Sequence, residues 1–285
     1  MEFLMDTLVS AEWLKHHIND PDLVVLDCTV VTMPDANDPR GLHNVSGRPD
    51  YELGHIPSAG FADLKGELCK SIGPVEFGLL SPDKFCTAMG ELGVGNDTRV
   101  VLYDANYTGW AARVWWMLRW VGFDSAAILD GGLTAWTSTG NELSLETVTR
   151  PIKTLTPKPR HKLIADHDEV LSGINDDAVI LVDTLPEAFY RGEMSIYPRA
   201  GHITSAVNID GLSLLDKKGH LLSQDELAIK HRLDRSARII TYCGGGIVAS
   251  TEAFVLTRLG YKDIAVYMAS LEEWTTDPCN PMEVG

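Results

Sequence analysis

The stretch RIITYCGGGIVAS (residues 238–250) joins an apolar run to a cysteine, three glycines and the beginning of a second apolar pattern. Continuous apolar runs of this length are typical of strands that are buried on both faces of a sheet. We therefore expect a strand that ends at Tyr242, a tight loop over 243–246 and a helix over 247–259. In an open parallel sheet, such a loop lies at the carboxyl ends of the strands, where binding sites form.

The same order of patterns occurs twice in the chain. RVVLYD (99–104) resembles RIITYC (238–243), GHIPSA (54–59) resembles GHITSA (201–206), and LVVLDC (23–28) resembles VILVDT (179–184). Near the end of each copy, Trp136 and Trp274 lie 138 residues apart. The repeat predicts two domains, 1–140 and 163–285, joined by a proline-rich linker over 141–162.

Each copy alternates short β-branched runs with helical patterns, which predicts an α/β fold with an open, mostly parallel sheet flanked by helices. Ser81 and Ser223 are expected to cap helices because each precedes a helical pattern. Asp104 in the first copy occupies the position that Cys243 has in the second. The two copies are therefore expected to share one fold, with a cysteine at this strand end in the second copy alone.

Charge and cysteine content exclude several classes of function. The 285 residues include 24 basic and 40 acidic side chains, a net charge of −16, so we expect neither a nucleic-acid partner nor a membrane partner. Five widely spaced cysteines without a CxxC pair predict neither a disulfide framework nor a zinc site. The histidines show no metal-ligand spacing, and nothing in the sequence requires a metal or an organic cofactor.

The N-terminal segment lacks the basic and then apolar order of a signal peptide, and Arg113 and Arg119 interrupt the apolar run over 109–123. We therefore expect a cytoplasmic protein. Four tryptophans of this run are expected to pack in the core or between the domains: Trp110, Trp115, Trp116 and Trp120.

Cys243 is the principal candidate for chemistry. A helix N-terminus offers free N–H groups and a partial positive charge, which stabilise a thiolate. The glycines let the backbone turn its N–H groups inward and keep side chains from blocking approach. The residues whose N–H groups are expected to surround the sulfur are Gly244, Gly245, Gly246, Ile247 and Val248.

Other readings of the cysteine loop are less consistent with its spacing. A cysteine phosphatase needs an arginine six positions after the cysteine, where this chain has Ala249. A dinucleotide-binding loop needs GxGxxG after the first strand of its fold. A cysteine protease or acyltransferase needs a base, for which His55 or His202 is available. A buried, inert cysteine in a glycine-rich turn is the alternative without chemistry.

The two units, GHIPSA and GHITSA, LDGGLTAW (129–136) and the lone cysteine in YCGGGIVAS (242–250) resemble the tandem-domain rhodanese/3-mercaptopyruvate sulfurtransferase family. The resemblance covers nearly the whole chain and implies two tandem rhodanese-like domains, with the catalytic cysteine in the C-terminal one. It implies that Cys243 takes sulfur from thiosulfate or 3-mercaptopyruvate as a persulfide and passes it to cyanide, a thiol or thioredoxin. The alternative is a non-catalytic binding or scaffold module, since rhodanese units can lose activity.

The resemblance leaves the sulfur donor open. Thiosulfate enzymes of the family commonly have basic residues in the loop, whereas mercaptopyruvate enzymes have Cys-Gly-Ser/Thr-Gly, and Gly245 lacks that hydroxyl. Mercaptopyruvate enzymes bind the substrate carboxylate with two arginines, of which Arg199 matches one and Arg191 lies two residues from the other. His55 matches a family histidine near the interdomain cleft, but a structural role is expected because His202 occupies the same place in the other copy.

Two pairs of residues outside the loop are also assigned from the sequence. Asp27 and Asp183 end strands in both copies, so a structural role is expected for them. Cys69 and Cys279 are expected in loops.

Overall fold

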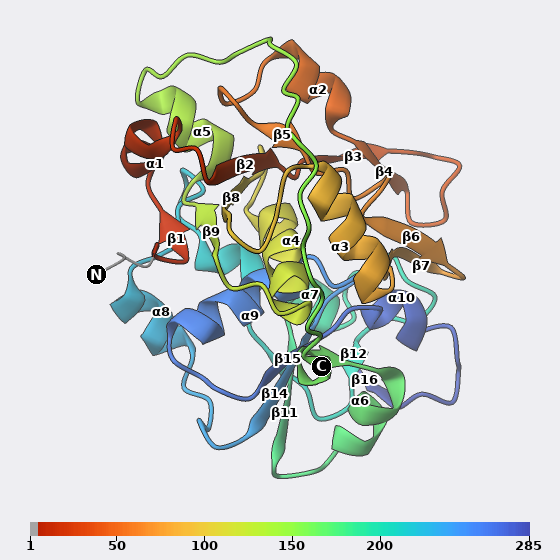
Figure 1. Cartoon of the computed structure of the whole chain (residues 1–285). Helices are drawn as coiled ribbons and strands as arrows, with labels where there is room; N and C mark the ends of the chain where they lie inside the picture. Colours follow the sequence, from red (N-terminus) through yellow and green to blue (C-terminus); the bar gives the residue numbers. More distant parts are fainter. Residues whose placement is uncertain (1–4) are drawn as a thin grey trace.

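The computed structural model describes residues 5–285 and contains two units, each with a five-stranded parallel sheet flanked by helices (Figure 1). Residues 1–4, which belong to the segment considered for a signal peptide, lie outside the described part. The strands of the first sheet are β1 (Leu8–Val9), β2 (Leu23–Asp27), β5 (Gly60–Phe61), β8 (Arg99–Tyr103) and β9 (Ala126–Leu129). The helices of this unit are α1 (Ala11–His17), α2 (Arg48–Leu53), α3 (Pro82–Glu91), α4 (Gly109–Trp120) and α5 (Gly132–Ser138).

Two antiparallel hairpins belong to the first unit: β3 (Val30–Pro34) with β4 (Leu42–Ser46), and β6 (Cys69–Ile72) with β7 (Val75–Leu79). The second sheet consists of β10 (Ile164–Ala165), β11 (Val179–Asp183), β13 (Val207–Asn208), β14 (Arg238–Tyr242) and β15 (Ile264–Tyr267). Its helices are α6 (His167–Gly173), α7 (Glu187–Tyr190), α8 (Gln224–Lys230), α9 (Val248–Arg258) and α10 (Ser270–Trp274), with 3₁₀ turns η1 (His161–Leu163) and η2 (Gly211–Leu214). A small antiparallel pair, β12 (His202–Ile203) with β16 (Met282–Glu283), completes the unit.

The two sheets have the same topology, which confirms the predicted repeat and α/β fold. Their strand orders are β1-β9-β8-β2-β5 and β10-β15-β14-β11-β13, and every neighbouring pair is parallel. Asp104 follows β8 and Cys243 follows β14 directly. Both side chains therefore stand at the carboxyl end of the central strand of their sheet, where sites form in such folds.

The helices α4 and α9 pack against each other between the two units, as Figure 1 shows near the centre of the molecule. Trp115 meets Phe254 edge to face, with ring centroids 4.7 Å apart. All four tryptophans of α4 are buried, as predicted, and one hydrophobic cluster includes residues of both units. The units therefore share a core, which fixes the end of α9 that carries the cysteine loop.

Local expectations are largely confirmed, with one error. Ser81 and Ser223 cap α3 and α8, and α9 begins and ends one residue inside the predicted helix. Cys279 lies in an exposed turn, as expected. The prediction for Cys69 is wrong, because it lies in β6 with 6% of its surface exposed. A tight turn through Gly73 (φ +56°) folds β6 onto β7, and Cys69 is thereby placed in the core.

The segment between the units runs along the first one. The N–H of Lys153 donates to the Gly90 carbonyl (3.0 Å), and the N–H of Lys158 donates to the Val121 carbonyl (2.7 Å). The division into 1–140, 141–162 and 163–285 remains a proposal. No helix within residues 5–285 is long and apolar enough to cross a membrane.

Two buried carboxyl groups end the equivalent strands β2 and β11. Oδ1 of Asp183 accepts a bond from the Leu185 N–H (2.8 Å), while Oδ2 has no partner among the described residues. Burial raises the pKa of Asp183 to about 7 and that of Asp27 to about 6. The neutral acid is therefore the form of Asp183 that the folded chain favours at mildly acidic pH.

This assignment predicts how Asp183→Asn changes stability with pH. The favourable contribution of the neutral acid is complete below its unfolded pKa of about 3.9 and is lost as pH rises through about 7. The amide cannot ionise, so the urea midpoint of the variant should exceed that of the wild type increasingly from pH 4 to pH 7 and level off above. Asp177→Asn, at an exposed turn, serves as the control. A midpoint difference that is independent of pH would contradict the assignment.

Candidate active site

The thiol of Cys243 lies inside the loop between β14 and α9. The N–H of Gly246 points at Sγ over 3.1 Å, and the N–H of Cys243 donates to Oγ of Ser270 (3.1 Å). Gly246 adopts a left-handed conformation (φ +77°), which the turn requires. The structure thus places one of the predicted N–H groups on the sulfur, and bonds to it from the other loop residues stay predictions.

The corresponding loop of the first unit already holds an acidic side chain. The Asp104 carboxyl accepts bonds from the N–H groups of Asn106 (2.9 Å), Thr108 (3.1 Å) and Ala111 (3.0 Å). Burial raises the pKa of Asp104, and these N–H bonds oppose the rise. The loop after this strand therefore directs backbone N–H groups at an acidic side chain, and in the second unit the Gly246 N–H is directed at the sulfur of Cys243.

Arg113 is a site residue that the sequence analysis missed, since it was noted only as an interruption of an apolar run. It comes from α4 of the first unit, is fully buried, and donates through Nη1 to the Gly246 carbonyl (3.2 Å) and through Nη2 to the Phe77 carbonyl (2.6 Å). Burial lowers the pKa of Arg113, while the nearby Cys69 and Cys243 thiols oppose that change. The sequence does contain a sign of this role, because a charged residue within an otherwise buried helix needs a specific partner.

A cleft of about 340 Å³ lies between the units beside the loop. The first unit contributes Pro39, Arg40, Pro74 and Glu76, and the second contributes Ser195, Ile196, Tyr197, Pro198, Glu272 and Thr276. Arg40 is bound within the cleft to Glu76 (3.1 Å) and Glu272 (3.3 Å). Tyr197 and Glu272 of this lining also lie against Gly244 and Gly245, so the cleft adjoins the cysteine loop.

Tyr197 covers the loop on the cleft side. A Cβ added to Gly244 would collide with the Tyr197 hydroxyl, so the ring lies directly on the backbone next to Cys243. Burial raises the pKa of Tyr197, and the neighbouring Cys243 and Glu272 add to the rise. Because the cysteine itself is only 2% exposed, a reagent in the cleft is expected to reach the sulfur when this ring moves.

The two predicted substrate arginines make contacts away from the cysteine loop. Nη1 of Arg199 donates to the carbonyls of Asp277 (3.0 Å) and Asn280 (2.7 Å). Arg191 is exposed and pairs with Glu187. Of the two, Arg199 is closer to the cleft, since it directly follows a cleft-lining proline.

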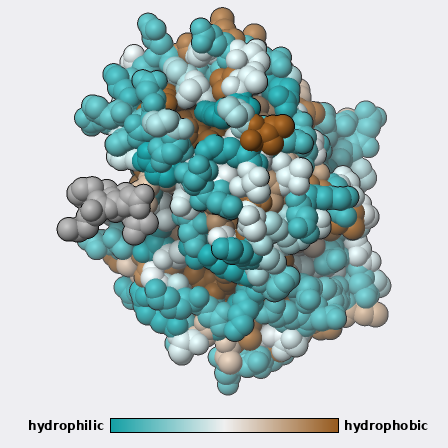
Figure 2. Space-filling model, viewed as in Figure 1, coloured by the Kyte–Doolittle hydropathy of each residue, from teal (hydrophilic) through white to brown (hydrophobic). Residues whose placement is uncertain are grey.

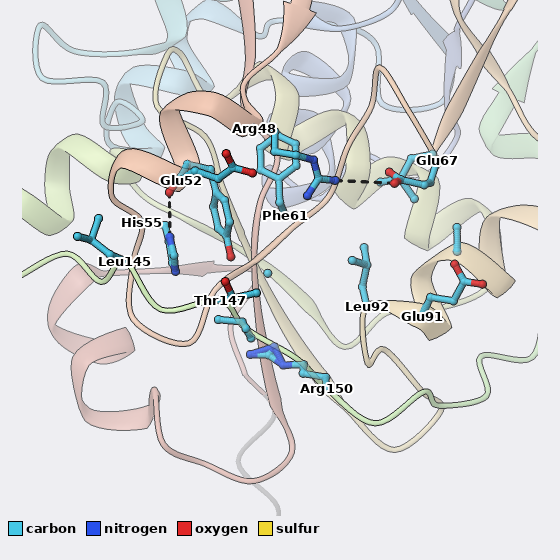
Figure 3. A pocket seen from close by; sticks show the side chains of 15 residues that line it. Arg48, Glu52, His55, Phe61, Glu67, Glu91, Leu92, Leu145, Thr147 and Arg150 are labelled. Atoms are coloured by element: carbon cyan, nitrogen blue, oxygen red, sulfur yellow. Dashed lines mark hydrogen bonds and ion pairs between the residues drawn. The ribbon is translucent and has the colours of Figure 1, made fainter.

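His55 belongs to a different cavity. Its ring nitrogens lie 2.9 Å from the Tyr51 carbonyl and 3.1 Å from the Glu146 carbonyl, and it stacks on the Tyr51 ring. His202 repeats this arrangement on Tyr190, with Nδ1 2.7 Å from the Tyr190 carbonyl. Figure 3 shows His55 together with Arg48 and Arg150 around this cavity. The cavity has a volume of about 490 Å³ and lies between the first unit and the segment that follows it. These contacts support the structural role expected for both histidines.

Among residues 5–285, no group of three or more histidine, cysteine, aspartate or glutamate side chains is arranged to hold a metal ion. The surface in Figure 2 is mostly hydrophilic, with isolated hydrophobic residues, as suits a chain with a net charge of −16. The cysteine loop and its interdomain cleft are thus the features that combine a nucleophile, an anion-binding backbone and open space.

Known proteins share this architecture. The rhodanese-like domain family matches residues 10–139 and 166–277. The chain belongs to the rhodanese family. A probable 3-mercaptopyruvate sulfurtransferase of Pseudomonas aeruginosa is 32% identical over 288 residues, which cover 98% of each chain. Thiosulfate sulfurtransferase of Rattus norvegicus is 29% identical over 286 residues, which cover 96% of this chain and 93% of the relative.

A solved structure agrees with the whole two-unit arrangement of this chain. The crystal structure of SseA from Escherichia coli, described as a 3-mercaptopyruvate sulfotransferase with the rhodanese fold, superposes with a TM-score of 0.81 at 29% identity. The match covers 93% of this chain and 99% of that one. Because sulfurtransferases match the chain over nearly its whole length, the chain is an enzyme of this class, a sulfurtransferase.

The geometry of the cysteine loop predicts that Gly246→Ala loses activity. The added Cβ would lie 2.5 Å from Nη1 of Arg113 and 2.6 Å from the Met268 carbonyl, so the loop must shift. Misplacement on this scale should lower sulfur transfer to cyanide about 100-fold. Gly219→Ala is the matched control, because Gly219 also has positive φ (+83°) but nothing within 4 Å of an added Cβ. Equal activity of the two variants would argue against a role for the loop geometry.

The position of Tyr197 predicts faster alkylation of Cys243 in Tyr197→Ala. Removing the ring opens the loop to the cleft, so modification of Cys243 by iodoacetamide, followed by peptide mass spectrometry, should accelerate about tenfold as the sulfur becomes accessible. Exposed Cys279 provides an internal reference whose rate should not change. An unchanged rate at Cys243 would show that the ring does not control access.

Proposed function

We propose that Cys243 is the sulfur carrier of this sulfurtransferase. The observation that carries the proposal is the Gly246 N–H, which points at Sγ from 3.1 Å within a loop whose counterpart binds the Asp104 carboxyl. Backbone N–H groups directed at a sulfur anion stabilise both a thiolate and a persulfide, as an oxyanion hole stabilises oxygen. When the outer sulfur is bound, further N–H groups of the loop are proposed to donate to it beside that of Gly246: those of Gly244, Gly245, Ile247 and Val248.

The reaction proceeds in two transfers. The Cys243 thiolate attacks the outer sulfur of thiosulfate or the thiol sulfur of 3-mercaptopyruvate, and an S–S bond forms while the donor's S–S or C–S bond breaks. Its electron pair leaves with sulfite, from thiosulfate, or with the enolate of pyruvate, from 3-mercaptopyruvate. An acceptor such as cyanide, a thiol or reduced thioredoxin then attacks the outer sulfur and regenerates the Cys243 thiolate.

The charges around the cleft favour 3-mercaptopyruvate as the donor. Thiosulfate is a dianion, the cysteine loop has no charged side chain to neutralise it, and Glu76, whose pKa is lowered, lines the cleft as a carboxylate. Mercaptopyruvate carries one carboxylate, for which Arg199 remains our proposed partner beside the cleft, with Arg191 as the second candidate. Binding there would require each arginine to exchange a present contact for the substrate carboxylate.

A cytoplasmic location and a thiol acceptor such as thioredoxin complete the proposal. In the described residues all five cysteines are free thiols, as expected in a reducing compartment.

Mass spectrometry tests the central step. Incubation with 3-mercaptopyruvate should add one sulfur atom, about 32 Da, to Cys243, and cyanide should remove it. Cys243→Ser should lose sulfur transfer entirely, whereas Cys279→Ser, which removes an exposed thiol, should retain it. Sulfur transfer by the Cys243→Ser variant would refute the assignment. The ratio of kcat/KM for mercaptopyruvate and thiosulfate tests the donor, and a value below one would reject our choice.

A further inference from the structure

The carboxyl group of Glu272 occupies the space that a side chain at Gly245 would fill. A Cβ built on Gly245 would lie 3.2 Å from Cδ, Oε1 and Oε2 of Glu272. The backbone of Glu272 is fixed at this place because its N–H donates to the Gly244 carbonyl (2.9 Å). The loop therefore has a carboxyl group from α10 beside its middle glycine, in place of a side chain of its own.

The fold does not require an acidic residue at this position. The repeat aligns YMASLEEW (267–274) with LDGGLTAW (129–136), so Glu272 corresponds to Thr134 of the first unit. Thr134 is exposed, and α5 forms there as α10 does in the second unit. The glutamate is therefore specific to the unit that carries the cysteine.

The surroundings of Glu272 hold its carboxyl group in place. Oε2 accepts a bond from the Glu76 N–H (2.9 Å), and Oε1 lies 3.3 Å from Nη1 of Arg40, both from the first unit. The buried Arg113 also interacts electrostatically with the Glu272 carboxyl group, and that carboxyl group in turn raises the pKa of Tyr197. Only 9% of the side chain is exposed, yet it borders the cleft, so it can meet a bound donor while remaining largely protected from water.

These surroundings move the pKa values of the neighbouring Glu272 and Glu76 carboxyl groups in opposite directions. Burial raises the pKa of Glu272 to about 7, and the charge of Glu76 adds to the rise against the effects of Arg40 and Arg113. Although burial opposes it, bonds from Lys65 and Asn44 lower the pKa of Glu76. Near neutral pH, one carboxyl group thus exchanges a proton while its neighbour stays ionised, which is the arrangement of a general acid.

The two candidate donors differ in their need for such a proton. When the C–S bond of 3-mercaptopyruvate breaks, the electron pair remains on the methylene carbon as the pyruvate enolate, and this carbon must receive a proton to become the methyl group. Sulfite leaves thiosulfate without a proton on carbon. A general acid beside the loop therefore matters for mercaptopyruvate alone.

We propose that Glu272 is the catalytic acid that protonates the methylene carbon of pyruvate as Cys243 takes the sulfur, an inference that rests on the sulfur transfer proposed above. The Cys243 thiolate attacks the mercaptopyruvate sulfur, the S–S bond forms and the C–S bond breaks. The proton of the Glu272 carboxyl passes to the carbon, leaving pyruvate, a Cys243 persulfide and the Glu272 carboxylate. The carboxylate then takes the proton of the persulfide, whose anion the loop N–H groups hold.

Glu272→Gln tests this role, because an amide of the same size can still accept the Glu76 N–H but cannot give up a carboxyl proton. In the first turnover, pyruvate release from mercaptopyruvate should fall about 100-fold, the effect typical of a general acid, while sulfite release from thiosulfate should change less than about threefold. In the wild type, the mercaptopyruvate rate should decline as pH rises through about 7, since the acid form is required, and the variant should lose this decline.

Glu76→Gln provides the matched control, since it removes a carboxylate that also contacts Arg40 but does not border Gly245. It should alter the two donors alike and keep a decline of the mercaptopyruvate rate with rising pH, moved to lower pH because the Glu76 charge no longer raises the pKa of Glu272. Gly245→Ser combined with Glu272→Ala should recover about tenfold over Glu272→Ala alone, because the serine hydroxyl enters the vacated space and can transfer a proton.

The outcomes distinguish this inference from the proposed function. If Glu272→Gln lowers the rates with both donors equally, or leaves both the ratio of these rates and the pH profile unchanged, the role of Glu272 as an acid is overturned. Sulfur transfer by Cys243 would still stand. A wild type that releases sulfite but no pyruvate also overturns it. If neither donor places sulfur on Cys243, the proposed function itself fails, and the inference with it.

Discussion

The cysteine loop depends on one buried guanidinium that reaches it from the other half of the chain. Arg113 donates hydrogen bonds to the Gly246 carbonyl of the second unit and to the Phe77 carbonyl of the first. Nη1 of Arg113 also lies 3.5 Å from the Gly245 carbonyl, and the same peptide unit carries the Gly246 N–H that points at the sulfur (3.1 Å). Since a buried charge without partners would cost several kcal/mol, the loop, α4 and β7 are constrained together.

This dependence explains why the first unit persists without a cysteine at the end of its central strand. Its own loop closes on the Asp104 carboxyl, which satisfies three backbone N–H groups from within the chain. The unit supplies instead the buried Arg113, the packing of α4 on α9, and Arg40 and Glu76 on one side of the cleft. In one copy of the fold the loop thus binds a buried carboxyl group of its own, and in the other the equivalent place holds the sulfur of Cys243.

Much of the fold followed from local patterns. The repeated strand, loop and helix patterns predicted both sheets and placed Asp104 and Cys243 at equivalent strand ends, because apolar periodicity and helix caps act over a few residues. The error at Cys69 arose where a short hairpin buries a residue within a polar stretch. Arg113 was overlooked because its partners lie 36 and 133 residues away, and no local pattern reveals them.

The sequence by itself determined the duplicated α/β fold, the family and the position of the single cysteine that begins the second loop, since these depend on residue type and short-range spacing. Only the tertiary structure decided what surrounds that cysteine. It placed Arg199 and Arg191 in contacts outside the loop and brought Glu272, Tyr197 and Arg40 together from distant segments. The physical reason is that the cleft forms where two separately patterned units pack, so its charges depend on long-range contacts between side chains.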